Sequence, residues 1–256
     1  MRKYLLDLTV ISNIRINSRC TLLKLKSTDG LPVIKPGQFV QVRVDGSSTA
    51  FLRRPFSVHF VDKQNNEIWL LIQIIGKGTE RLSELKKNDV VNVLLPLGNG
   101  FTIPDKGQYT CLLVGGGVGI APLLYLGQQL VENGHKTTFL IGARTKQDLY
   151  QLDLLAAYGS VFTTTEDGSA GEKGFVTNHS LLTSAYFSKL YVCGPKPMMK
   201  AVARYAIEKN MECEVSLENT MACGLGVCLC CVENTKSGNV CVCKDGPVFN
   251  VNKLLW

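Results

Sequence analysis

Cysteine is the residue type that most restricts how this chain can fold. Six of its ten cysteines fall within 21 residues, from Cys223 to Cys243. Cysteines crowded in this way either form disulfides or hold a metal. The N-terminal apolar run is broken by Asp7 and no small-residue cleavage site follows, so the segment does not resemble a secretory signal. We therefore expect a cytoplasmic protein whose cysteines ligate metal.

The spacing of the cysteines indicates which metal. Four residues separate Cys223 from Cys228, two separate Cys228 from Cys231, and eleven more precede Cys243. This is the pattern of plant-type 2Fe-2S centres. Two glycines between the first two cysteines let the backbone wrap around a small inorganic core. Zinc is the alternative, although zinc ribbons usually carry paired Cys-x2-Cys spacings.

Two further cysteines compete for the ligand positions. The spacing selects Cys231 over Cys230. Cys243 precedes a Lys-Asp-Gly-Pro turn sequence suited to fixing the direction of its thiolate, whereas Cys241 is expected two residues upstream on the same strand face. The choice of Cys243 rests on the family resemblance given below.

The N-terminal part of the chain has the texture of a small antiparallel β-barrel. Short alternating or apolar runs, such as residues 38–44 and 68–75, are separated by Gly, Pro, Asn and Asp. One helix is expected over residues 80–87, capped by Thr79. We place this domain at residues 1–104, before the linker Pro-Asp-Lys-Gly.

After the linker, strands and helices alternate, which predicts an α/β domain with a parallel sheet covered on both faces. The expected strands are residues 110–114, 136–142, 161–164 and 190–193, and the expected helices are 122–133, 147–157 and 197–210. From about Val215 onward Gly and Cys dominate and regular periodicity is lost. We therefore divide the remainder into a domain at 105–212 and a small iron-sulfur module at 213–256.

Charge and hydropathy exclude several classes of function. The net charge is +7, but the chain contains no block of like charges. Basic and aromatic residues are not interleaved as in nucleic-acid interfaces. The uncharged stretch 107–131 holds four glycines and Pro122 at its centre, so a strand, a loop and a buried helix explain it better than a membrane span. Neither nucleic acid nor membrane is expected as a partner.

Two short motifs in the barrel are suited to an anionic cofactor. In Arg53-Arg54-Pro55-Phe56-Ser57 an arginine can neutralise a pyrophosphate, while the aromatic ring and the serine can contact a flavin. About twenty residues later, Gly76-Lys77-Gly78-Thr79 leads into a helix, a geometry that offers backbone N–H groups to phosphate. Ordinary barrel surface and a plain hairpin turn are the alternatives.

Two glycine-containing turns mark the second domain. The run from Gly115 through Gly116, Gly117 and Gly119 follows a strand and precedes a helix, but no frame of it satisfies G-x-G-x-x-G. It fits either dinucleotide binding or close packing of helix on sheet. Cys193 and Gly194 end another strand, where a nicotinamide could lie or where a small buried cysteine simply fills space.

Together these motifs resemble the ferredoxin-NADP reductase superfamily over residues 1–212. The Cys-Gly-x-Gly-x-Cys-x2-Cys run, with Cys-Lys-Asp-Gly-Pro-Val-Phe after it, is similar to the electron-transfer subunits of NAD-dependent dihydroorotate dehydrogenase, class B. Phe56 stands where many superfamily members have Tyr, and the gap before the fourth cysteine varies in length in the family.

The resemblance implies an oxidoreductase component that relays electrons in pyrimidine (UMP) biosynthesis. An FMN-containing catalytic partner would oxidise dihydroorotate, and electrons would pass through the 2Fe-2S cluster and FAD to NAD, in a heterotetramer of two plus two subunits. No residue of this chain is expected to act as an acid, base or nucleophile. The family motif assigns FAD binding to Arg54, Pro55, Phe56, Ser57, Leu71, Ile72, Gln73, Gly78 and Thr79.

The resemblance assigns nucleotide binding to the glycine run of the second domain together with Cys193 and Gly194. It assigns metal ligation to Cys223, Cys228, Cys231 and Cys243. A related NAD(P)H-ferredoxin or sulfide-linked reductase subunit, serving another partner, is the nearest alternative. A non-catalytic iron-sulfur sensor is a more distant one. The preference for NAD over NADP follows from the resemblance only.

Overall fold

The computed structural model describes residues 2–105 and 107–256. The expected domain start at Met1 and the linker residue Lys106 lie outside the described residues. The chain forms two compact units. Unit 1 comprises residues 1–100, 219–233 and 239–247, and unit 2 comprises residues 101–218, 234–238 and 248–256. None of the helices in the described part of the chain is long and apolar enough to cross a membrane.

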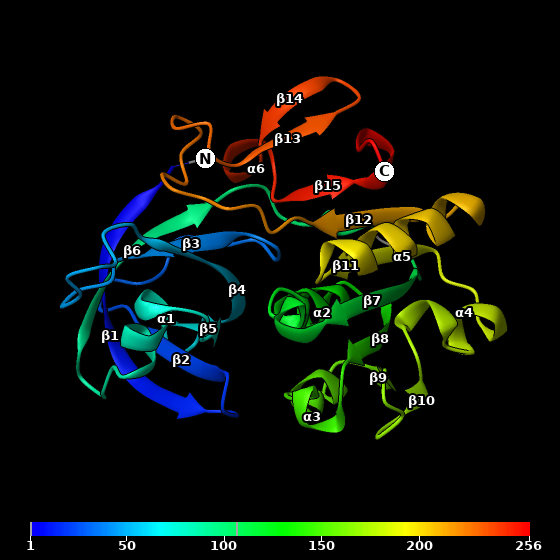
Figure 1. Ribbon diagram of the computed structural model, residues 1–256, viewed down its shortest axis with the longest axis horizontal. Helices are drawn as coiled ribbons and strands as arrows, with labels where there is room; N and C mark the ends of the chain where they lie inside the picture. Colours follow the sequence, from blue (N-terminus) through cyan, green and yellow to red (C-terminus); the bar gives the residue numbers. More distant parts are fainter. Residues whose placement is uncertain (1, 106) are drawn as a thin grey trace. The chain divides into compact units, whose positions relative to one another are not determined.

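Unit 1 is built on a closed antiparallel barrel in which the described strands follow the order β1-β2-β5-β4-β3-β6 (Figure 1, blue through cyan to green). The strands are β1 (Tyr4–Arg15), β2 (Cys20–Lys26), β3 (Phe39–Val42), β4 (Arg54–Asp62), β5 (Glu67–Gln73) and β6 (Val90–Leu97). Pairing of β1 with β6 closes the barrel. Apolar side chains from every strand fill its interior, among them Leu8, Leu23, Val40, Val58, Leu70 and Val93, all without exposed surface.

The single helix of the described barrel region, α1 (Lys77–Ser83), begins and ends earlier than the expected 80–87. Thr79 is therefore not the cap, and that prediction is wrong. Its hydroxyl lies inside the first turn, accepts the N–H groups of Ile75 (3.0 Å) and Gly76 (3.1 Å), and donates to the Gly76 carbonyl (2.9 Å). A threonine that folds back on the preceding loop has the same sequence signature as one that caps a helix.

Unit 2 contains a sheet of order β10-β9-β8-β7-β11-β12-β15, parallel except for its last strand (Figure 1). The strands are β7 (Thr110–Gly116), β8 (Lys136–Ala143), β9 (Ser160–Thr165), β10 (Glu172–Lys173), β11 (Lys189–Cys193), β12 (Glu212–Ser216) and β15 (Val248–Asn250). Strands β12 and β15 lie beyond the expected alternation. β15 has only three residues, and it is a strand only because it pairs with β12, which lies more than thirty residues earlier in the chain.

Helices cover both faces of this sheet. Gly127 of α2 (Leu123–Glu132) packs on the ring of Phe139, whereas Val176 of the 3-10 turn η3 (Val176–Asn178) packs over Gly142. The Phe139 side chain and the Cβ position of Gly142 point to opposite faces because successive strand residues alternate. The remaining helical segments are η1 (Gly117–Ile120), η2 (Lys146–Asp148), α3 (Leu152–Ala156), α4 (Leu181–Ser184), α5 (Lys196–Glu208) and η4 (Val251–Lys253).

The expected helix over 147–157 is instead two short pieces, η2 and α3. Gln151 between them has a φ of +63°, which no helix continues through. The hairpin of β13 (Val232–Thr235) and β14 (Gly238–Cys241) is followed by the short helix α6 (Val242–Asp245). Residues of this C-terminal segment belong to both units. The boundaries 1–104, 105–212 and 213–256 remain a prediction.

Candidate functional site

The cysteine loop, residues 219–231 of unit 1, is a tightly turned segment between β12 and β13. Its backbone has positive φ at Gly224 (+68°), Gly226 (+82°) and Leu229 (+57°). The two glycines are also closely packed, because a Cβ on Gly224 would lie 2.9 Å from Gln41 Cγ and one on Gly226 would lie 3.0 Å from Lys244 Cδ. The positive φ thus favours glycine at both positions, and a Cβ would in addition displace the neighbouring side chain.

Backbone amides of this loop and of α6 point at the sulfur atoms of three predicted ligands. The N–H of Leu225 donates to Cys223 Sγ (3.3 Å), that of Gly226 to Cys243 Sγ (3.1 Å), and that of Cys243 to Cys231 Sγ (3.3 Å). Hydrogen bonds to sulfur stabilise negative charge and tune iron-sulfur centres. The donor set therefore fits thiolates that hold a cluster.

The predicted ligands differ in exposure. Cys231 and Cys243 are buried, Cys223 is partly buried and Cys228 is exposed. None of the ten cysteines forms a disulfide. Among the described residues, no group of three or more His, Cys, Asp or Glu side chains already forms a metal-binding set.

The surroundings move the pKa values of two of these thiols in opposite directions. Burial raises the pKa of Cys223, but N–H groups of Cys228, Leu225 and Val227 donate to its sulfur and outweigh burial, which brings the pKa to about 6. Burial, followed by the neighbouring Cys231, raises the pKa of Cys243 to about 12. Before metal binds, the loop thus already favours the thiolate at Cys223.

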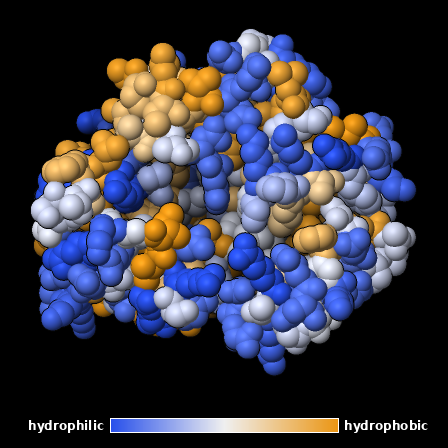
Figure 2. Space-filling view, viewed as in Figure 1, coloured by the Kyte–Doolittle hydropathy of each residue, from blue (hydrophilic) through white to orange (hydrophobic). Residues whose placement is uncertain are grey.

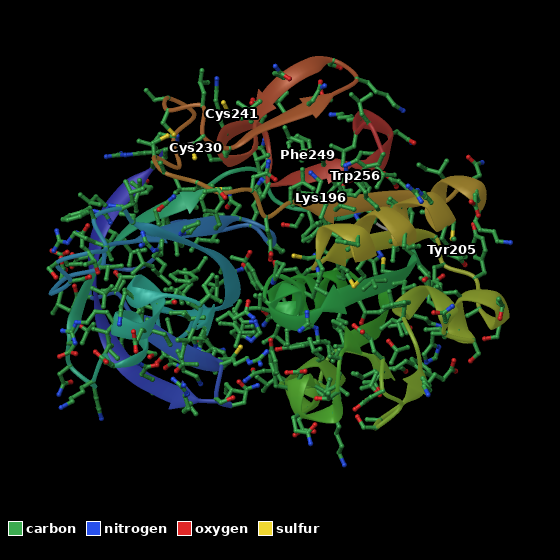
Figure 3. The ribbon with its side chains drawn as sticks, viewed as in Figure 1. Lys196, Tyr205, Cys230, Cys241, Phe249 and Trp256 are labelled. Carbon is green, nitrogen blue, oxygen red and sulfur yellow. The ribbon has the colours of Figure 1, made fainter. Side chains whose placement is uncertain are left out.

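The two competing cysteines occupy different positions. Cys230 is exposed on the cysteine loop, and Cys241 ends β14 (Figure 3). The expectation that Cys241 and Cys243 share a strand face is wrong, because the strand stops at Cys241 and Cys243 lies in α6. The backbone N–H of Cys241 is fixed by Asp245 Oδ2 (2.9 Å).

The two motifs expected to bind FAD come together in unit 1. A Cβ placed on Gly78 would lie 2.8 Å from Arg54 Nε, so the guanidinium group packs directly on the backbone at the start of α1. Arg54 Nη1 also donates to the Leu52 carbonyl (2.7 Å). The neighbouring Arg53 turns elsewhere and donates to the carbonyls of Gln41 and Asn92. Arg54 is thus the arginine of the pair that lies with the glycine motif.

The other expected FAD residues lie on adjacent strands of the barrel. Pro55, Phe56 and Ser57 are half-buried on β4, which pairs with β5, the strand that carries Leu71, Ile72 and Gln73. The side chains of Leu71 and Ile72 are buried, whereas Gln73 is half-buried. Leu71 and Ile72 therefore offer little surface, from side chain or backbone, to a ligand.

The glycine run of unit 2 separates into two kinds of position. Side-chain atoms of Ile120 and Leu123 lie 2.9–3.0 Å from a Cβ built on Gly115, those of Met198 and Pro195 lie 2.6–2.9 Å from one on Gly116, and the Cys193 carbonyl lies 2.4 Å from one on Gly119. These three glycines serve close packing. Gly117 differs, since it has a φ of +55° and nothing within 4 Å of its Cβ position.

The turn after β11 is held against the glycine run. Gly194 has a φ of +151°, and a Cβ there would lie 2.9 Å from the backbone nitrogen of Gly116. Cys193 is fully buried, and burial, followed by the carboxylate of Glu218, raises its pKa well above the usual value. Cys193 Sγ donates weakly to Glu218 Oε1 (3.9 Å). Glu218 was not expected from the sequence, although an acidic residue just after a parallel strand is a recognisable signal.

Three domain families match the chain in the order of these sites. The oxidoreductase FAD-binding domain matches residues 6–101, the oxidoreductase NAD-binding domain matches residues 113–204, and the iron-sulfur cluster binding domain of dihydroorotate dehydrogenase B matches residues 218–255. The electron transfer subunit of dihydroorotate dehydrogenase B (NAD(+)) from Shouchella clausii is 38% identical over 261 residues, covering 100% of both chains.

The chain belongs to the family of dihydroorotate dehydrogenase B electron-transfer subunits. The subunit of this family from Fusobacterium nucleatum is 36% identical and covers 95% of each chain. A solved structure described as an NADH-dependent reduced ferredoxin-NADP oxidoreductase is 31% identical, with a TM-score of 0.87 over 97% of this chain and 90% of that one.

Membership confirms the predicted fold class, an FAD-binding barrel, a mainly parallel nucleotide-binding sheet and a small C-terminal iron-sulfur region. It also confirms that the chain is an oxidoreductase component of dihydroorotate dehydrogenase B and, as a subunit, works with a catalytic partner. The individual site residues remain predictions.

Proposed function

We propose that this electron-transfer subunit carries electrons from the FMN of a dihydroorotate-oxidising partner, through a 2Fe-2S cluster and FAD, to NAD+ in pyrimidine (UMP) biosynthesis. The observation that supports the proposal most strongly is the set of backbone amides directed at Cys223, Cys231 and Cys243. Cys228, the remaining ligand in the x4, x2 spacing, lies exposed on the same loop. A bound cluster would supply one-electron transfer at this position.

In the proposed FAD site the chain's own residues bind and orient the cofactor. Arg54, packed on Gly78, offers positive charge to the pyrophosphate. Phe56 offers an aromatic face, Ser57 offers a hydroxyl group, and Pro55 keeps β4 extended. The remaining contacts are assigned to Leu71, Ile72, Gln73 and Thr79. When bound, FAD would exchange single electrons with the cluster and hydride equivalents with NAD. The cluster and NAD cannot react with each other directly, because one transfers single electrons and the other a hydride.

In the proposed nucleotide site Gly117 is the position where a dinucleotide can approach the backbone, because open space lies over it. The turns around this position pack closely on the chain at Gly115, Gly116 and Gly119, where no side chain separates them from the backbone. Cys193 and Gly194 lie at the end of β11, where ligands of parallel sheets bind. NAD is the proposed nucleotide.

The partner is proposed to dock at the cysteine loop, in an assembly of two catalytic and two electron-transfer subunits. Leu225, Val227 and Leu229 of this loop are exposed, with Val227 at 79%. Figure 2 shows apolar residues gathered where Figure 1 draws this loop. Exposed apolar patches of this kind mark interaction surfaces. A partner that covers them would bring its own cofactor toward the cluster.

Reconstitution with the FMN-containing subunit tests the relay. Cys231→Ser should abolish dihydroorotate-dependent NAD+ reduction while FAD content and NADH diaphorase activity persist, because only the path between the flavins is interrupted. Cys230→Ser, one position away on the same loop, is the matched control and should leave coupled turnover intact. Coupled activity in the Cys231→Ser protein, or its loss in the Cys230→Ser protein, would contradict the proposed relay.

A further inference from the structure

Gln41 of β3 is a buried polar residue whose side chain has no visible partner. It has no exposed surface, and both its Nε2 and its Oε1 lack a hydrogen bond. Within the described residues, the only other buried side-chain atom in this condition is Thr164 Oγ1, in unit 2. Buried amides are nearly always hydrogen-bonded, because leaving them unpaired is costly. An unpaired carboxamide therefore indicates a partner that the polypeptide itself does not supply.

The side chain of Gln41 lies against the cysteine loop. The Cβ position of Gly224, the residue directly after Cys223, is 2.9 Å from Gln41 Cγ and 3.0 Å from Gln41 Nε2. Neighbouring side chains Val40 and Val42 are also fully buried, and they alternate with Gln41 along the strand. The amide is consequently directed to the opposite face from these valines, toward the loop that carries three of the proposed ligands.

Gln38, three residues earlier, shows that this region satisfies its amides where it can. Its Oε1 accepts the backbone N–H of Lys35 (2.8 Å), and its Nε2 donates to the carbonyl of Gly98 (2.8 Å). Gln38 is as deeply buried as Gln41, at 1% exposure. The two glutamines are equally buried, yet only Gln41, which lies beneath the cysteine loop, has an unpaired amide.

On its other side, Gln41 adjoins the proposed FAD motif. Its register partner on β4 is Pro55, and its backbone carbonyl accepts from Arg53 Nη1 (3.3 Å). Residues opposite each other in an antiparallel pair direct their side chains to the same face. Gln41 thus lies between the strand assigned to the flavin and the loop assigned to the cluster.

We propose that the Gln41 carboxamide donates a hydrogen bond to a sulfur atom of the iron-sulfur cluster and thereby raises the reduction potential of the cluster. The inference rests on the proposed function, since it requires a cluster on this loop. Reduction adds negative charge to the cluster, so a donor to sulfur stabilises the reduced state more than the oxidised state. In this role Gln41 tunes the cluster through one hydrogen bond and transfers no electron itself.

The test is an EPR-monitored redox titration of the purified holoprotein carrying Gln41→Met. Methionine preserves the volume and removes the donor, so we expect the reduction equilibrium to shift about tenfold toward the oxidised cluster, which is about 59 mV for a one-electron couple. The FAD potential in the same sample should stay unchanged. Gln38→Met is the matched control, because it removes a buried amide whose partners are backbone groups and should leave the cluster potential where it is.

Gln41→Asn, which retracts the amide by one methylene, is the second variant and should lower the potential in the same direction. An unchanged cluster potential in both variants would overturn the proposal, as would a shift confined to FAD. Loss of the cluster from both variants would also overturn it, because Gln41 would then hold the loop instead of setting a potential. Absence of any cluster signal in the unmodified protein would instead refute the proposed function.

Discussion

Replacing Gly119 with alanine should destabilise unit 2, because this glycine permits the closest backbone approach in the proposed nucleotide site. A Cβ there would lie 2.4 Å from the Cys193 carbonyl oxygen and 2.5 Å from Gly194 Cα, about 1 Å inside ordinary contact. Both neighbours are backbone atoms, so no side chain can swing away. Overpacking of this kind costs about 1–3 kcal/mol.

The assay is thermal unfolding of the purified protein without nucleotide, followed by circular dichroism. Each kcal/mol lowers Tm by about 4 °C for a domain of roughly 100–150 residues, the size range of unit 2. The matched control is Gly117→Asn in the same turn. Space is open at Gly117, and asparagine tolerates its φ of +55° better than most residues. We expect a smaller loss of stability in Gly117→Asn but a raised KM for NADH, because its side chain enters the proposed nucleotide site.

Two results would contradict these expectations. Gly119→Ala with wild-type stability would mean that the turn after β11 is not held by the contact at Cys193. Gly117→Asn with an unchanged KM for NADH would mean that the nucleotide does not approach at that glycine, and the run would then serve packing alone.

Further outcomes concern other parts of the chain. The Lys189 ammonium group is buried, 3.3 Å from Glu212 and 3.5 Å from the buried Glu214. Lys189→Met should therefore lower the free energy of unfolding by about 3–5 kcal/mol in denaturant titrations, and adding Glu214→Gln should recover part of that loss. Equal losses in the single and the double variant would contradict this. Cys193 is fully buried, and burial raises its pKa well above the usual value, so iodoacetamide should leave it unmodified in the native protein and modify it after denaturation. Peptide mass mapping measures this, and labelling of the native protein would contradict the burial. Arg54→Leu should lower FAD content after purification, whereas Arg53→Leu should mainly lower stability; equal FAD loss in both would argue against Arg54 as the phosphate residue.

The fold could be predicted from the sequence wherever the information was local. The apolar runs at β7, β8 and β11 are typical of buried parallel strands, and each was expected near its observed bounds. The features that the sequence did not predict depend on backbone conformation or on distant parts of the chain. The break at Gln151 is a backbone conformation that a favourable helical pattern conceals, and β15 is defined by pairing with β12.

The candidate sites show the same limit. Sequence motifs identified Arg54 and Gly78 separately, and the structure brings them into contact. The four glycines from 115 to 119 look equivalent in sequence, yet only their surroundings distinguish the open Gly117 from the three that are closely packed. Gln41 carries no motif at all. It is distinguished by an unpaired amide beneath a loop that lies about 180 residues later in the chain.

We propose that a 2Fe-2S cluster is held by Cys223, Cys228, Cys231 and Cys243. Low-temperature EPR of the dithionite-reduced protein, quantified against iron and acid-labile sulfide, tests it most directly. We expect one spin-half signal with about two irons and two sulfides per chain, lost in Cys231→Ser and retained in Cys230→Ser. Stoichiometric zinc without labile sulfide, or a cluster that survives Cys231→Ser and disappears in Cys230→Ser, would contradict it.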